Sequence, residues 1–161
     1  MIRLYHGSNQ EIGEIDLSRG LPGKDFGQGF YLPHQAERMA LSKCKRSQGK
    51  SPTVTVFEFD EEEALRQKLR IKVFSKSTEA WAKFVTNNRH ASRKGYTHHY
   101  DIVIGPVADD SMTLQFRLYE QGLITLRQLV RKITFPHNNS QHFFATERAV
   151  SLLRKVDVIN I

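Results

Sequence analysis

The sequence predicts a single α+β domain over residues 1–161. Segments with strand character alternate irregularly with amphipathic segments of helical period, unlike the regular alternation of a doubly wound fold. With 161 residues, of which 39% are hydrophobic, the chain is long enough to bury an apolar core without disulfide bonds. It contains no internal repeat and no linker-like segment, so we expect short strands and helices within one domain.

Seven segments predict strands because β-branched and aromatic residues dominate them. The segment 101–107, Asp-Ile-Val-Ile-Gly-Pro-Val, has the strongest strand character. In the segment 53–59, apolar residues occur in both phases of alternation, which predicts a strand covered partly on both faces. The predicted strands are residues 2–6, 30–32, 53–59, 70–74, 101–107, 142–145 and 156–161.

Six segments predict helices because apolar residues recur three and four positions apart. In the segment 35–48, Met39, Ala40 and Lys43 or Cys44 share one face. Thr125 and Gln128 form a capping pair at the start of another helix. The predicted helices are residues 35–48, 61–69, 78–88, 111–121, 125–132 and 146–155, and the main connections are a long loop at 8–23, a mobile basic loop at 89–99 and a turn at 138–141.

The charge balance predicts an anionic partner. The chain carries 24 Lys and Arg residues against 17 Asp and Glu residues, which gives a net charge of +7. Such a field attracts nucleic acid, acidic protein surfaces and phosphate-bearing small molecules alike. The single Cys44 cannot form an internal disulfide, so we expect a reducing compartment and a cytoplasmic protein. No apolar run approaches the roughly 18 residues of a membrane span, and no secretory signal or membrane partner is expected.

Two short stretches carry the functional interpretation. One is Phe26-Gly27-Gln28-Gly29-Phe30-Tyr31, where closely spaced glycines let the backbone approach a ligand and the aromatic residues offer a flat apolar wall. The other is Leu4-Tyr5-His6-Gly7-Ser8, a strand that ends in a histidine and two small residues. The structural alternative is that the glycines only form a turn before a core strand. No P-loop or dinucleotide fingerprint is present, and the histidines lack ligand spacing, so no metal site is predicted.

Together these stretches resemble the first two signature strands of the ADP-ribosyltransferase superfamily, in the histidine-tyrosine branch of diphtheria-type toxins and poly-ADP-ribose polymerases. Over residues 2–155 the whole chain is similar to a bacterial family of unknown function, DUF3990. The shared segments are Ile-Asp-Leu-Ser-Arg-Gly at 15–20, Val-Ala-x-Asp before Thr-Leu within 107–114, and Gln-x-x-Phe at 141–144. The resemblance implies a split β-sheet with flanking helices and an NAD-binding cleft.

The resemblance also implies roles for individual residues. His6 would bond a ribose of NAD+, the main chain of Gly7 would pair with the nicotinamide amide, and Tyr31 would stack on the nicotinamide ring. Because both side chains are positively charged, Arg19 or Lys24 is expected to meet the pyrophosphate. The remaining residues expected to bind NAD+ are Ser8, Phe26, Gly29 and Phe30, with Phe26 or Phe30 completing the aromatic clamp.

The third signature position departs from the superfamily pattern. A glutamate normally occupies it on a late strand, and Gln141 stands there in this chain. Glutamine can hold a ribose hydroxyl, but it cannot act as a general base or supply negative charge. Glu147 is expected in a helical turn, at a helix N-terminus. With His6 and Tyr31, Gln141 completes the set of expected catalytic residues.

The expected function is therefore an NAD+-dependent mono-ADP-ribosyltransferase, a bacterial toxin or effector of a toxin-antitoxin pair. The acceptor would be a protein or a nucleic acid, and a cognate antitoxin is an expected partner. Three alternatives stay open at this point. The chain could be an NAD+ glycohydrolase, a module that binds NAD, ADP-ribose or RNA without turnover, or a basic RNA-binding domain in which the glycine segments are only turns.

Overall fold

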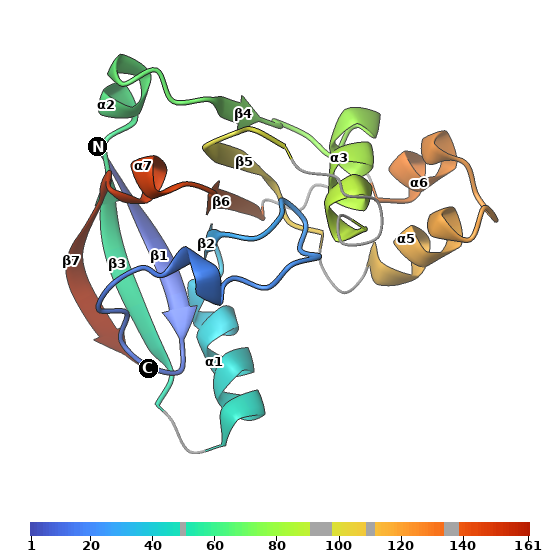
Figure 1. Cartoon of the computed structure of the whole chain (residues 1–161). Coiled ribbons are helices and arrows are strands. Elements are labelled where there is room, and N and C mark those ends of the chain that lie inside the picture. Colours follow the sequence, from blue (N-terminus) through green and yellow to red (C-terminus); the bar gives the residue numbers. More distant parts are fainter. Residues whose placement is uncertain (49–50, 91–97, 109–111, 134–138) are drawn as a thin grey trace.

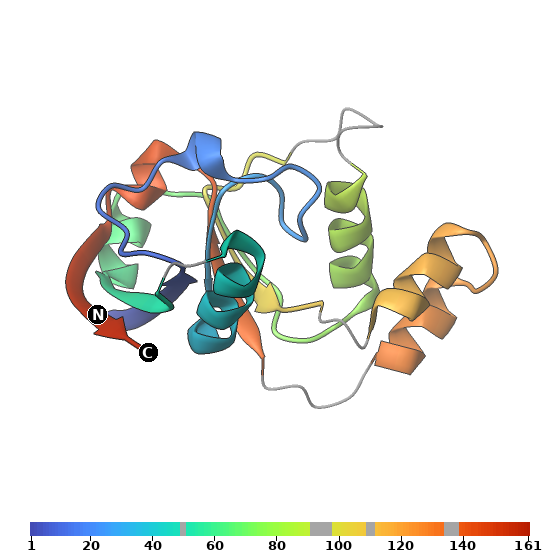
Figure 2. The ribbon, with the colours of Figure 1, turned by 90° about the horizontal axis from the view of Figure 1, so that it is seen from below.

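The computed structural model of the chain describes residues 1–48, 51–90, 98–108, 112–133 and 139–161. In these residues it forms two β-sheets flanked by helices, which confirms the predicted α+β class (Figure 1). The three-stranded sheet stands at one end of the molecule and helices α5 and α6 stand at the other (Figure 1 and Figure 2). The four-stranded sheet lies between them.

The three-stranded sheet has the order β1-β3-β7 with antiparallel pairs. Its strands are β1 (Ile2–Ser8), β3 (Thr53–Phe59) and β7 (Leu153–Asn160). The predicted strand at 53–59 coincides with β3, and all but one of its residues are buried. Apolar residues in both phases of alternation therefore did indicate a strand covered on both faces.

The four-stranded sheet has the order β2-β6-β5-β4, and its one parallel pair is β4 with β5. Its strands are β2 (Phe30–Pro33), β6 (Ser140–Phe144), β5 (Ile102–Pro106) and β4 (Ile71–Val73). A buried apolar cluster that includes Leu4, Phe57 and Phe144 joins the two sheets. A second cluster, with Phe26, Trp81 and Phe143, packs the helical end onto the four-stranded sheet.

Side-chain caps explain where most helices begin. The helices are α1 (Ala36–Ser47), α2 (Glu61–Arg66), α3 (Glu79–Arg89), α5 (Thr113–Glu120), α6 (Leu126–Ile133) and α7 (Glu147–Val150), with a 3-10 turn at Leu17–Arg19. Asp60, Thr78 and Thr146 cap α2, α3 and α7 through their side-chain oxygens. The predicted capping pair is confirmed, because Thr125 Oγ1 accepts from the Gln128 amide at 3.2 Å while Gln128 Oε1 accepts from the Thr125 amide at 2.8 Å.

Two sequence predictions near the C-terminus are wrong. The helix expected at 146–155 stops after α7, and the chain enters β7 at Leu153, which pairs with Phe59 of β3. Of the turn expected at 138–141, residue 138 lies outside the described residues. Ser140 and Gln141 are instead the first residues of β6, since they pair with Pro106 and Gly105. In both places pairing with a distant strand overrides the local preference. Most of the predicted mobile loop, residues 91–97, lies outside the described residues. Among the helices that are described, none is both long and apolar enough to cross a membrane.

Candidate functional site

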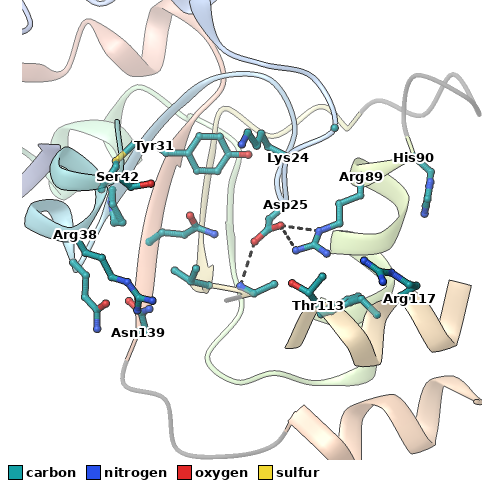
Figure 3. A pocket seen from close by; sticks show the side chains of 18 of the residues that line it. Lys24, Asp25, Tyr31, Arg38, Ser42, Arg89, His90, Thr113, Arg117 and Asn139 are labelled. Atoms are coloured by element: carbon teal, nitrogen blue, oxygen red, sulfur yellow. Dashed lines mark hydrogen bonds and ion pairs between the residues drawn. The ribbon is translucent and has the colours of Figure 1, made fainter. Parts of the chain in front are cut away.

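A cleft of about 750 Å³, here called the helix cleft, lies between α1 and α5 (Figure 3). One face of α1 forms a wall with Arg38, Ser42 and Arg46, spaced four residues apart along the helix. Thr113, Arg117 and Glu120 of α5, spaced four and three residues apart, form the opposite wall. Figure 3 shows the labelled side chains of the two helices on opposite sides. The lining residues between the walls come from the loop before β2, from β2 and from the start of β6, and include Lys24, Asp25, Tyr31, Asn139 and Gln141.

A second cavity of about 460 Å³, here called the His6 pocket, adjoins the helix cleft. Its lining includes six of the residues predicted to bind NAD+, namely His6, Ser8, Arg19, Gly29, Phe30 and Tyr31. Lys24, Tyr31, Met39 and Arg46 line both spaces. Tyr31 therefore stands where the two spaces meet, with the predicted donor residues on one side and Gln141 on the other.

Two of the predicted residues do not line either space. Phe26 has no exposed surface and packs against Phe74, Phe84 and Phe143, so it offers no face to a ligand. The expectation that Phe26 forms part of an aromatic clamp is therefore not supported, whereas Phe30 does line the His6 pocket. Gly7 lies against α1, where a Cβ atom would be 1.9 Å from the carbonyl oxygen of Ala36.

His6 is held in a single tautomer by its two neighbours. Its Nδ1 atom lies 2.7 Å from the Tyr31 carbonyl oxygen, which can only accept, so Nδ1 carries the hydrogen. Its Nε2 atom then accepts from the ammonium group of Lys43 at 3.0 Å. The ring stacks on Phe30 with 4.3 Å between centroids. Burial, followed by the charge of Lys43, lowers the pKa of His6 to about 3, so the ring is neutral at physiological pH.

Lys43 was not among the residues predicted to form the site. Burial, followed by the charges of Lys24 and Arg46, lowers the pKa of Lys43 to about 8. One signal was present in the sequence, because helical spacing placed a lysine on the same face as Met39 and Ala40. A cation on the inner face of a helix requires a polar partner, and the structure supplies His6.

Acid is expected to destabilise the fold through its buried histidines. Burial lowers the pKa of His6 to about 3 and that of His142 to about 4, both below the ordinary value of 6.5. The unfolded chain therefore binds protons that the folded chain does not, and stability present above pH 6.5 is lost as the pH falls toward 4. Each histidine adds up to about 1.4 kcal/mol per pH unit to the slope of the free energy of unfolding against pH. Urea unfolding between pH 6.5 and 4.5 measures this slope. The His6→Asn variant lacks one of these protons, so its slope of unfolding free energy against pH should be smaller by about 1.4 kcal/mol per pH unit. An unchanged slope would show that His6 is charged in the native protein.

The glycine segment before β2 is fixed by several hydrogen bonds. The Tyr31 hydroxyl donates to the Gly27 carbonyl at 2.6 Å and accepts from the Phe26 amide at 3.0 Å. Nε2 of His98 lies 2.6 Å from the Phe26 carbonyl oxygen. The ring of Phe143 lies 4.7 Å from that of Tyr31 and supports it from the core side. Burial raises the pKa of the Tyr31 phenol, so this residue contributes an aromatic face and no proton acceptor.

The acids that line the helix cleft have basic partners. Asp25 accepts from Nε of Arg89 at 3.0 Å and from Nη2 at 2.9 Å, and its other oxygen accepts from the Ala108 amide at 3.2 Å, as the dashed lines in Figure 3 mark. Glu120 lies 3.1 Å from Nε2 of His90. These contacts tie the glycine segment, α3 and the chain after β5 together, and they involve residues that sequence reasoning did not select.

Gln141 is the most deeply buried polar side chain of the helix cleft, with 6% of its surface exposed. Its Nε2 atom is buried and has no hydrogen-bond partner, and the same is true of Oδ1 of Asn139. An unpaired buried polar atom costs about 1–3 kcal/mol, so such atoms in a cleft point to a ligand that would satisfy them. Gln141, expected at the third signature position, thus lines the same cleft as Tyr31.

Comparison with known families gives one match. A family profile described as "Protein of unknown function (DUF3990)" matches residues 2–154. The chain belongs to the DUF3990 family. No curated protein and no solved structure shows significant similarity to this DUF3990 protein. The resemblance to DUF3990 is therefore confirmed, and the function of the DUF3990 protein has to be argued from its own site.

Proposed function

We propose that the protein is an NAD+-dependent mono-ADP-ribosyltransferase, the toxin or effector of a toxin-antitoxin pair, with a fold related to the ADP-ribosyltransferase superfamily. The observation that carries the proposal is the position of the Tyr31 ring, at the junction of the His6 pocket and the helix cleft. A planar ring that stacks on Tyr31 would have the predicted donor residues on one side and the unpaired amide of Gln141 on the other.

The donor would occupy the His6 pocket. Nicotinamide would lie on the exposed face of Tyr31, whose other side is supported by Phe143. The pyrophosphate would meet Arg19 and Lys24, two cations of the pocket lining. Nε2 of His6 accepts from the Lys43 ammonium group, so a ribose hydroxyl that donates to Nε2 would displace that ammonium group.

The reaction exchanges one glycosidic bond for another. The bond between ribose C1′ and the nicotinamide nitrogen breaks, and its electron pair leaves with nicotinamide. The acceptor nucleophile forms the new bond to C1′ and loses its proton. The Gln141 amide would hold a ribose hydroxyl but takes no proton, and the Tyr31 phenol is not a base, so the acceptor proton goes to water. We therefore expect slow transfer without polymerisation.

Release of nicotinamide tests this proposal. We expect purified protein incubated with NAD+ to release nicotinamide in amounts that rise when cell lysate is added, because the lysate supplies the acceptor. The measurement is free nicotinamide by chromatography, together with labelled ADP-ribose retained on macromolecules. Nuclease or protease treatment of the lysate should abolish the retained label and so identify the acceptor as nucleic acid or protein.

The other outcomes would replace the proposal. Equal release with and without lysate, and no retained label, would identify an NAD+ glycohydrolase. Binding of NAD+ by calorimetry without any release would identify a binding module. In either case the cognate antitoxin, if present, would still be expected to bind the folded domain.

A further inference from the structure

We infer that the helix cleft is the acceptor site and that the acceptor is a single-stranded nucleic acid. The transfer itself rests on the proposed function, whereas the binding of the acceptor does not. The residues assigned to the donor lie mainly in the His6 pocket, and the larger helix cleft adds walls from α1 and α5 that the donor does not use.

The charges of the cleft favour a polyanion. Its two acids, Asp25 and Glu120, are paired with Arg89 and His90. Among the residues that the structure describes, no acid pairs with the remaining cations of the lining, which are Lys24, Arg38, Arg46 and Arg117. Four cations without acidic partners around one recess produce a positive field, and the guanidinium group of arginine binds phosphate groups through paired hydrogen bonds.

The spacing of the cations favours a ligand with several phosphates. Arg38 and Arg46 are two helical turns apart on α1, which corresponds to about 12 Å along the helix axis. Arg117 faces them from α5, on the other wall (Figure 3). Three cations spread along this length and on two walls suit a ligand with more than one phosphate group. A chain with one phosphate per nucleotide can follow α1 and also contact α5.

The shape of the site favours a single strand over a duplex. These cations line a recess between two helices, and a rigid double helix presents its phosphates on a broad convex surface that does not enter such a space. Proteins that hold single strands combine a cationic groove with aromatic faces and polar atoms for the bases. The helix cleft supplies such a polar atom in the buried, unpaired Oδ1 of Asn139, whereas the exposed face of Tyr31 is assigned to nicotinamide.

Asn139 also connects the acceptor to the reacting centre. Its main-chain carbonyl accepts from the Val107 amide at 2.9 Å, so the backbone just before β6 is held in place. Gln141 follows two residues later and lines the same cleft. A base whose amino group donates to Asn139 Oδ1 would therefore lie beside the ribose that Gln141 is proposed to hold. The carboxylate side chains of an acidic peptide would match the charges, but an ionised carboxylate has no hydrogen to donate to this acceptor atom.

Binding in the absence of NAD+ tests the inference separately from turnover. The probes are fluorescently labelled single-stranded RNA and DNA of about 20 nucleotides, the corresponding duplexes and poly-glutamate, measured by fluorescence anisotropy. We expect single strands to bind with strong salt dependence. Arg38→Glu and Arg117→Glu, both at exposed positions, should each weaken binding about tenfold and reduce the salt slope. The matched control is Arg127→Glu, an exposed arginine of α6 outside the cleft, which should change binding less than about twofold.

Three results would overturn the inference. These are equal losses in the Arg127→Glu control, tighter binding of the duplex than of the single strand, and displacement of RNA by equimolar poly-glutamate, which would assign the cleft to an acidic protein. If the strands bind as expected but receive no ADP-ribose while lysate proteins do, the helix cleft is a single-strand binding site and not the acceptor site. If no macromolecule is labelled, the proposed function fails while the binding of single strands stands.

Discussion

The Gly7→Ala variant is expected to lose about 3–5 kcal/mol of its free energy of unfolding, or to fail to fold. A Cβ atom at this position would lie 1.9 Å from the Ala36 carbonyl oxygen and 2.6 Å from the Ala40 amide nitrogen. Both are backbone atoms of α1, so no side-chain rotation can relieve the clash and the whole helix would have to move. Urea unfolding followed by circular dichroism measures the effect.

The control for this prediction is Gly13→Ala. A Cβ atom at Gly13 would meet nothing within 4 Å, and its backbone lies outside the left-handed region. Stability should therefore change by less than about 0.5 kcal/mol. If the urea midpoint of Gly7→Ala matched that of Gly13→Ala, the close approach of α1 to β1 would be wrong.

The contact at Gly7 also positions the site. Because α1 lies directly on β1 at this glycine, Lys43 on the same helix reaches His6 on β1, and Arg38 and Arg46 line the helix cleft. A moderate loss of this packing would therefore move one wall of the cleft as well as reduce stability.

Local chemistry explains which parts of the fold could be predicted. The strand β3 alternates apolar residues in both phases, and the capping pair of Thr125 and Gln128 encodes the start of α6 within four residues. Both signals depend only on neighbours in the chain. The predicted helix at 146–155 failed because the residues after α7 obtain their structure from pairing with β3, about one hundred residues earlier in the sequence. Such pairing leaves little trace in a local pattern.

Only part of the candidate site could be predicted from the sequence. His6, Tyr31 and Gln141 could be selected because each lies in a short motif, and the structure brings them to two adjoining spaces. Gly29 was expected to make room for a ligand, yet a Cβ atom there would lie 2.4 Å from the Phe143 ring and 2.6 Å from the Phe144 carbonyl oxygen. Its lack of a side chain is required by internal packing.

The electrostatic contacts of the site were beyond sequence reasoning. Asp25 and Arg89 are 64 residues apart, and the Lys43 contact joins α1 to β1. Which acid pairs with which base depends on the packing of whole elements. The sequence revealed the excess of positive charge, and the structure adds the position of cations without acidic partners at the helix cleft.

The Tyr31→Ala variant is expected to lose about 10- to 100-fold in nicotinamide release, if the protein has the proposed activity. Removal of the ring takes away the flat surface for nicotinamide at the junction of the two spaces, and stacking of this kind contributes about 1–3 kcal/mol. The substitution also removes the hydroxyl that bridges Gly27 and Phe26, so the glycine segment loses a support. The measurement is the initial rate of release with saturating lysate.

Tyr31→Phe separates the ring from the hydroxyl. It keeps the aromatic face but leaves the Gly27 carbonyl and the Phe26 amide without their partner, which should reduce stability by about 1–3 kcal/mol. Because the phenol carries no proton-transfer role in the proposed mechanism, release by the folded Tyr31→Phe variant should stay within about tenfold of the wild-type rate. Equal rates for Tyr31→Ala and the wild type would remove the ring from the mechanism. An equal loss in Tyr31→Phe and Tyr31→Ala would instead assign the effect to the hydroxyl and the glycine segment that it holds.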